Sequence, residues 1–303
     1  MTAEYREEPC RSALNKVKGM GFKWSLNPYT GCVHRCTFCF VRAFELRADR
    51  PSDDRDGRSI RVKVNLVEVL RRELLRPSWR RELVAFGTAT DPYQPAEGRY
   101  RLTRGSVQAL VEMDTPFSLL TSGPLIVRDV DLPADASRRV EVTINFSVPT
   151  LDPEVWRKTE PWTSPPRQRL RALKVLSDAG VRAGVGMAPI LPGLSDRPEQ
   201  LTDVVRAARD AGASFIWCNV LYLRPGTREH FLESLARDWP EQLPRYEQIY
   251  AHGAYGRRAD VEAVRKQVRE LGRRHGIGDR PRLTPPPSRS WNEAVSEQLV
   301  LMA

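Results

Sequence analysis

Apolar segments alternate with helical patterns along most of the chain, and this alternation constrains the fold more than any other feature. Each apolar segment is short and rich in Val, Ile and Phe, as buried strands are. Because parallel neighbouring strands need a crossover connection, which is usually a helix, the alternation predicts an α/β fold with a parallel sheet. The six predicted strands lie at 22–27, 83–89, 117–122, 140–148, 181–190 and 215–223.

The predicted helices carry ordinary start and stop signals. One begins after Ser164 and two prolines and ends at Gly180, a residue suited to a left-handed cap. Others are predicted at 64–76, 103–113 and 201–212, and a basic amphipathic helix at 261–274. Residues 1–22 are polar and without a clear period, and the alternation stops after Trp239. We therefore expect three segments: a lead-in (1–22), a core (23–238) and a helical extension with a tail (239–303).

Composition limits the partners and the compartment. The 303 residues carry 48 Lys and Arg against 38 Asp and Glu, a formal net charge of +10. This excess favours a polyanionic partner such as nucleic acid, although an Arg-rich composition alone gives the same total. No apolar run approaches the roughly 20 residues that span a bilayer, and the first 25 residues lack the apolar core of a signal peptide. We therefore expect a cytoplasmic protein without membrane contact.

Three of the five cysteines, Cys32, Cys36 and Cys39, fall within eight residues. In a reducing compartment such a group indicates metal or redox chemistry rather than disulfides. A structural zinc site needs four ligands, and an electron-carrying cluster normally takes four thiolates. The chain has no second Cys or His pair at zinc-finger spacing, and Cys10 and Cys218 are remote in sequence. The remaining interpretation is a cluster held by three thiolates, which leaves one metal position open for a bound molecule.

The spacing C-x3-C-x2-C, with Phe38 before the last cysteine and Phe40 after it, resembles the signature of radical S-adenosylmethionine enzymes. Further segments are similar to the spore-photoproduct-lyase-like branch of that superfamily, in which many proteins lack an assigned substrate. These segments are NPYTGC (27–32), FGTATDPYQPAEGRYRLTR (86–104), VPTLDPEVWRKTEPWTSPPRQRLRALKVLSDAGV (148–181) and APILPGLSD (188–196). The resemblance covers about residues 23 to 225.

The resemblance implies a partial (β/α)6 TIM-like barrel over 23–238, followed by the C-terminal helical extension. It implies two cofactors, a [4Fe-4S] cluster and S-adenosylmethionine. In that superfamily an electron from the cluster cleaves S-adenosylmethionine to methionine and a 5'-deoxyadenosyl radical, which abstracts hydrogen from a substrate. The electron comes from an external low-potential donor, such as a flavodoxin- or ferredoxin-like protein. The substrate is not implied, and nucleic acid is one candidate.

The resemblance also assigns roles to residues at the strand ends. Cys32, Cys36 and Cys39 would ligate the cluster. The cofactor-binding candidates are Phe38 for adenine, Thr88, Thr90 and Asp91 for the methionyl amino group, and Asn145 and Ser147 for ribose or carboxylate. Each polar candidate could instead cap a strand or a turn.

The chain departs from the branch at two places. Ser122 stands in the third-strand turn, where related sequences tend to carry Lys. Photoproduct lyases use a Cys in the second-strand region as hydrogen donor, but this chain has none between Cys39 and Cys218, so thymine-dimer repair is not expected. Cys218, on the sixth strand, is the candidate catalytic hydrogen donor if it faces the lumen, and a packed core thiol is the alternative.

Two further interpretations stay open. The GVG segment at 184–186 could let backbone approach a cofactor closely, or it could allow tight strand-helix packing. A second class of function is a metal- or cluster-stabilised nucleic-acid-binding protein without radical chemistry, with the basic helix contacting phosphates.

Overall fold

The main sheet has eight strands. The computed structural model describes residues 3–42 and 57–280, and the strand order is β11-β10-β9-β8-β7-β6-β3-β2. Neighbours from β3 to β11 pair in parallel, and β2 pairs antiparallel with β3 at one edge. The six predicted strands are confirmed as β3, β6, β7, β8, β9 and β10. The bounds are β2 (Leu14–Lys16), β3 (Trp24–Leu26), β6 (Val84–Phe86), β7 (Phe117–Thr121), β8 (Val142–Ser147), β9 (Ala183–Ile190), β10 (Phe215–Val220) and β11 (Gly278–Asp279).

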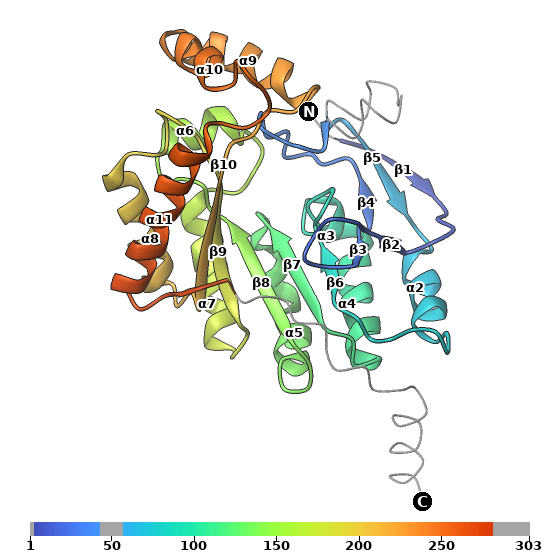
Figure 1. Cartoon of the computed structure of the whole chain (residues 1–303). Helices are drawn as coiled ribbons and strands as arrows, with labels where there is room; N and C mark the ends of the chain where they lie inside the picture. The colour runs from blue at the N-terminus through green and yellow to red at the C-terminus, as the bar shows by residue number, and fades with distance from the viewer. Residues whose placement is uncertain (1–2, 43–56, 281–303) are drawn as a thin grey trace, which may run out of the picture.

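Helices connect the successive parallel strands and pack against the sheet, so that the molecule is a partial TIM-like barrel (Figure 1). The sheet does not close on itself within the described residues, because β2 and β11 lie at its two ends. The predicted α/β class is therefore confirmed. The helical segments are α2 (Leu66–Leu74), α3 (Ala96–Tyr100), α4 (Leu102–Glu112), η2 (Pro124–Asp129), α5 (Asp131–Ala136), α6 (Pro153–Thr159), α7 (Pro166–Asp178), α8 (Pro198–Asp210), α9 (Thr227–Asp238), η3 (Pro240–Gln242), α10 (Leu243–Ile249) and α11 (Arg258–Arg274).

The ends of α7 and α8 follow from the local sequence. α7 begins at Pro166, and Gly180 follows its last turn with φ of +81°. α8 ends in the same way before Gly212, whose φ is +80°. Glycine adopts this left-handed conformation without steric cost. Both predicted helix ends are thus confirmed.

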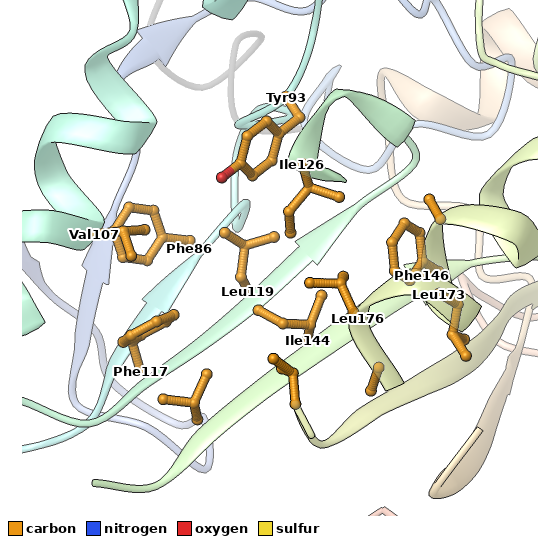
Figure 2. Packing of buried hydrophobic residues seen from close by; sticks show 14 of the residues in the cluster. Phe86, Tyr93, Val107, Phe117, Leu119, Ile126, Ile144, Phe146, Leu173 and Leu176 are labelled. Carbon is orange, nitrogen blue, oxygen red and sulfur yellow. The ribbon is translucent and has the colours of Figure 1, made fainter. Parts of the chain in front are cut away.

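The main core lies between the sheet and the helices (Figure 2). Phe86, Leu119 and Ile144 project from three adjacent strands into the same buried cluster as Leu176 of α7. Because side chains alternate across a strand, residue 145 points to the opposite face. That face is the lumen of the partial barrel.

The N-terminal segment holds strands that the sequence pattern did not predict. β1 (Glu4–Glu8) pairs in parallel with β5 (Ser59–Lys63), which pairs antiparallel with β4 (Tyr29–Thr30) in a second, small sheet. β1 is mostly exposed, so it carries no alternation of apolar and polar residues that would mark a strand. The sequence also predicts a helical segment at 40–47, after the cysteines, and a polar loop at 48–61. The loop ends in β5, whereas its residues up to 56 and most of the segment 40–47 lie outside the described residues.

The C-terminal extension is docked on the barrel. α11 packs on β10 through Val268 and Gly272. Arg269, Arg273 and Arg274 are exposed, as predicted, whereas Arg265 is partly buried and donates to Asn219 of β10 at 2.9 Å. β11 then adds one more parallel strand beside β10, which the sequence did not predict because the strand is only two residues long. The sequence also predicts a proline-rich spacer at 284–291, TPPPSRSW, and a short helix after it. Both fall in the segment 281–303, which lies outside the described residues. None of the helices in the described part of the chain is long and apolar enough to cross a membrane.

Candidate metal centre

The cysteine loop follows β4 and lies at the carboxyl ends of the barrel strands. Cys39 donates its N–H to the carbonyl of Cys36 at 3.1 Å, so the last two cysteines share one tight turn. Burial raises the pKa of Cys32 to about 12, and the charges of Asp91 and Cys39 add to this. Burial also raises the pKa of Cys36, and the charges of Glu160 and of the other two cysteines raise it further. The three thiols are thus close enough to influence one another, and a bound metal would have to supply the charge that favours their thiolates.

The donor set fits a cluster with several irons. Within residues 3–42 and 57–280, no three His, Cys, Asp or Glu side chains converge on one point as ligands of a single ion do. A cubane places its thiolates on different irons, so its ligands need not converge. The other two thiols lie elsewhere: the charges acting on Cys10 come from Lys63, Glu73 and Arg72, and those acting on Cys218 come from α11. Neither brings a fourth sulfur to the loop.

Two residues after β6 hold the start of the cysteine loop. Thr90 donates its hydroxyl to the carbonyl of Gly31 at 2.6 Å, and Gln94 donates to the same carbonyl at 3.1 Å. Gln94 also accepts the N–H of Val33 at 3.2 Å. Gln94 is fully buried. The predicted residue Thr90 therefore fastens the loop, together with Gln94, which sequence reasoning missed.

Helices α6 and α9 hold the other end of the loop. Thr37 donates its N–H to the carbonyl of Thr159 at 2.9 Å, and Thr227 donates its hydroxyl to the carbonyl of Cys39 at 3.1 Å. Phe38 packs against a second apolar cluster that includes Phe231 of α9. Figure 1 shows α6, α9 and α10 together beyond the end of β10. Phe38 is thus partly buried by protein at the position predicted to contact adenine.

Asp91 joins the ends of two strands. Its carboxylate accepts the hydroxyl of Thr121 at 2.5 Å, the N–H of Ser122 at 2.6 Å and the N–H of Tyr93 at 2.8 Å. His34 lies 3.4 Å from the same carboxylate, and burial lowers the pKa of this imidazole. The side chain of Asp91 is buried and engaged within the protein, in the manner of a cap. Ser122, where related sequences carry Lys, contributes its backbone to this contact.

Thr88 remains partly exposed at the end of β6. Asn27, just after β3, donates to the hydroxyl of Thr88 at 2.9 Å and accepts the N–H of Ala89 at 2.9 Å. This pair fixes the backbone between the first two barrel strands. The hydroxyl of Thr88 accepts from Asn27 and keeps its own hydrogen for another acceptor.

Asn145 is completely buried in the lumen. Its amide donates to Ser118 at 3.3 Å and to the carbonyl of Leu119 at 3.2 Å, and its oxygen accepts the indole N–H of Trp217 at 3.1 Å. It therefore links β7, β8 and β10. Ser147, two residues later, is partly exposed, and its hydroxyl donates to the carbonyl of Ala188 over a long distance of 3.5 Å.

The glycines of the GVG segment make room for aromatic residues of the neighbouring strand. A Cβ atom at Gly184 would lie 2.4 Å from the carbonyl oxygen of Phe215, and one at Gly186 would lie 2.7 Å from the ring of Trp217. Real Cβ atoms do not approach so closely. These glycines allow close packing between neighbouring strands, where one interpretation of the sequence had expected packing between strand and helix. The close approach of backbone to a cofactor stays a prediction.

Cys218 faces α11 rather than the cysteine loop. It packs against the main core, and the charges that act on its thiol are Arg265, Arg269 and Glu262 of α11. Burial raises the pKa of Cys218 to about 11. This placement matches the packed core thiol, and the role of hydrogen donor stays a prediction.

A buried ion pair lies beside the cysteine loop. Arg169 of α7 contacts Glu160, which follows α6, at 3.0 Å, and both side chains are almost completely buried. Arg169 also donates to the carbonyls of Ser164 and Ser147 and to the hydroxyl of Thr163. Sequence reasoning missed this pair because both residues are of types that normally lie on the surface.

Comparison with known proteins agrees with this geometry. A model of the Radical SAM superfamily matches residues 26–205. Uncharacterized protein Rv2578c of Mycobacterium tuberculosis is 41% identical over 286 residues, which cover 93% of this chain and 84% of that protein. Uncharacterized protein MJ0683 of Methanocaldococcus jannaschii is 23% identical over 260 residues, which cover 85% of this chain and 92% of that protein. A solved structure of a spore photoproduct lyase mutant with bound AdoMet and dinucleoside spore photoproduct has a similar fold, with a TM-score of 0.68, 16% identity, and coverage of 91% of this chain and 80% of that one.

Proposed function

The chain belongs to the radical SAM superfamily, and on this premise we propose that it cleaves S-adenosylmethionine reductively to start radical chemistry on a substrate. Members of this family use a [4Fe-4S] cluster and S-adenosylmethionine, and they need an external electron donor. One electron passed through the cluster breaks the bond between sulfur and C5', which yields methionine and a 5'-deoxyadenosyl radical that abstracts hydrogen. The observation that carries the proposal is the loop with Cys32, Cys36 and Cys39, which is fastened at both ends while Cys10 and Cys218 lie elsewhere.

We divide the predicted cofactor residues into two groups by their existing contacts. Thr88 and Ser147 are partly exposed at strand ends and are proposed to contact S-adenosylmethionine directly, with Phe38 beside its adenine. Thr90, Asp91 and Asn145 are buried and already hydrogen-bonded within the protein. Their proposed role is to hold the cysteine loop and the strand ends in position. A site held in this way needs little rearrangement when the cofactor binds.

For the substrate we propose a nucleic acid strand. The three large exposed aromatic side chains in the described part of the chain are Phe40, Trp162 and Tyr255. Phe40 follows Cys39 in the loop, and Trp162 comes shortly after α6, whose Thr159 accepts the N–H of Thr37 in the loop. Tyr255 stacks on Tyr222 with ring centroids 5.4 Å apart. Aromatic faces of this kind stack on bases in single strands.

Arg224 brings positive charge to the stacked pair of Tyr222 and Tyr255. Arg224 lies over the ring of Tyr222 at 5.9 Å and donates to the hydroxyl of Tyr255 at 3.2 Å. Burial raises the pKa of Tyr222, and the charge of Cys39 is among the smaller causes. This supports a position of the stacked pair near the proposed cluster. The net charge of +10 adds long-range attraction for phosphates.

Anaerobic reconstitution tests the radical chemistry. We expect a brown protein that holds about four irons and forms 5'-deoxyadenosine from S-adenosylmethionine when dithionite is added. Cys36→Ala should lose the iron and the product, whereas Cys10→Ala, the matched control, should keep both. A colourless protein that binds nucleic acid but yields no 5'-deoxyadenosine would contradict the enzyme and favour the binding module without radical chemistry.

Binding of a labelled single-stranded oligonucleotide, measured by fluorescence anisotropy, tests the substrate. Tyr255→Ala should weaken binding by about fivefold or more, as the loss of one stacked base does. An abasic strand of equal length should bind wild type more weakly than the strand with bases. Arg224→Gln should weaken binding more than Arg99→Gln, a matched control in which an exposed arginine also lies over a tyrosine ring. Equal binding of the abasic strand and the strand with bases would refute the proposal that the exposed aromatic side chains stack on bases.

A further inference from the structure

The carboxylate of Glu160 has an unusual environment. The residue is 1% exposed, and its Oε1 atom contacts Arg169 at 3.0 Å. Its Oε2 atom is buried and has no hydrogen-bond partner among the described residues. Buried carboxylate oxygens are normally hydrogen-bonded, because an unmade bond to a charged group is costly. A contact that only fixes structure would be expected to satisfy both oxygens.

Backbone contacts place this carboxylate beside Cys36. Thr37 donates to the carbonyl of Thr159, the residue before Glu160, at 2.9 Å. Because consecutive Cα atoms are about 3.8 Å apart, residues 36 and 160 lie within about 10 Å of one another. The carboxylate of Glu160 thus lies beside the loop that carries the proposed ligands of the cluster.

We propose that Glu160 lowers the reduction potential of the cluster held by Cys36, so that the bound cluster becomes a stronger reductant. This inference rests on the proposed function. Reduction adds one negative charge to the cluster, and a carboxylate nearby opposes that addition. Arg169 holds Glu160 in place through Oε1, whereas Oε2 has no hydrogen-bond partner among the described residues. Low dielectric at a buried position strengthens the effect.

For the magnitude we take the carboxylate and the cluster to be about 10 Å apart, which is the bound on the separation of residues 36 and 160. One unit charge at about 10 Å, with an effective dielectric constant of about 20, changes an equilibrium by about tenfold. Glu160→Gln removes the charge and keeps the shape. We therefore expect the reduced form to be favoured about tenfold more in this variant, a rise in midpoint potential of about 59 mV for one electron.

The experiment is a redox titration of the reconstituted protein, followed by electron paramagnetic resonance of the reduced cluster. Glu160→Gln should raise the midpoint potential, and Glu160→Asp, which keeps the charge, should stay near wild type. Glu154→Gln is the matched control, because it removes the same charge from the exposed face of α6, where solvent screens it. The double variant Glu160→Gln/Arg169→Gln should lie between wild type and Glu160→Gln. Thermal unfolding of each protein checks that it is folded.

The outcomes separate this inference from the proposed function. Wild-type protein that binds no iron would overturn the proposed function and this inference with it. Wild-type protein with a normal cluster, together with a Glu160→Gln variant of unchanged potential, would overturn this inference alone. If Glu160→Gln does not retain a cluster, the comparison of Glu160→Asp with the double variant decides, and equal potentials in those two would refute it.

Discussion

Gln94 should be the most sensitive of the residues that fasten the cysteine loop. Its amide joins the carbonyl of Gly31, the hydroxyl of Thr90 and the N–H of Val33, and the side chain is fully buried. Gln94→Ala leaves the N–H of Val33 without an acceptor, whereas the carbonyl of Gly31 keeps its bond from Thr90. The variant thus isolates the contribution of one side chain to the position of the loop.

The expected cost can be worked out contact by contact. A buried donor left without a partner costs about 1–3 kcal/mol, and each other lost hydrogen bond contributes about 0.5–1.5 kcal/mol. Some of these groups will find water once the side chain is gone, so we expect the free energy of unfolding to fall by about 2–4 kcal/mol. Urea unfolding of the metal-free protein measures this change. Iron retained after reconstitution should fall as well, because the loop that carries the cysteines loses one attachment.

A matched control is Gln108→Ala on α4. Gln108 donates only to exposed Glu112, so its loss should change the free energy of unfolding by less than about 0.5 kcal/mol. If Gln94→Ala is as stable as this control and retains iron like wild type, the loop is held by other contacts and the reasoning fails.

Three more predictions concern the fold around the site. Gly186→Ala should lower the free energy of unfolding, measured by urea titration, by about 1–3 kcal/mol, because the new Cβ atom overpacks the strands. In the control Gly98→Ala the new Cβ atom meets no atom within 4 Å, so the free energy of unfolding should not fall. Glu97→Gln should lower the free energy of unfolding by about 3–5 kcal/mol, because the buried carboxylate of Glu97 binds an arginine, a tyrosine hydroxyl and the start of α4. Glu112→Gln, which breaks an exposed ion pair, should lower it by under about 1 kcal/mol, and similar losses in the two variants would refute the burial argument. Burial lowers the pKa of His230 to about 4, and nearby arginines add to this effect. Between pH 6.5 and 4 the unfolded state therefore binds more protons than the folded state, so stability should fall as pH decreases through that window. Replacement of His230 by Gln should flatten the pH dependence, measured as melting temperature, and an unchanged slope would contradict this assignment.

The barrel strands could be predicted because burial on the helix-facing side imposes a pattern on local sequence. Segments such as 140–148 are rich in β-branched residues, and glycines such as Gly180 mark where helices stop. β1 and β11 escaped prediction for physical reasons. β1 is a mostly exposed strand stabilised by pairing with a segment more than fifty residues away, and β11 is too short to show a period.

The candidate site could be predicted only in part. Spacing reveals Cys32, Cys36 and Cys39 because all three lie on one short loop. The residues that fasten the loop come from distant positions: Gln94, Thr159 and Thr227 meet it only after the barrel has formed. No local pattern marks a glutamine or threonine for such a contact. The resemblance in sequence located polar side chains at the strand ends. It could not distinguish a side chain that is hydrogen-bonded within the protein from one that is available to a ligand.

The contribution of metal binding to folding depends on how many of the side chains around the site are already hydrogen-bonded within the protein. In small zinc modules the metal supplies most of the folding energy, because the chain buries little without it. Here a large buried core exists beside the site, and the hydrogen bonds of Thr90 and Gln94 attach the cysteine loop to the barrel. We therefore expect the chain to fold before it binds a cluster, and urea unfolding of the metal-free protein measures this. Among the buried side-chain oxygens without a hydrogen-bond partner in the described part of the chain, Oε2 of Glu160 belongs to a carboxylate, and its charge would act on the cluster's electrons rather than on the fold.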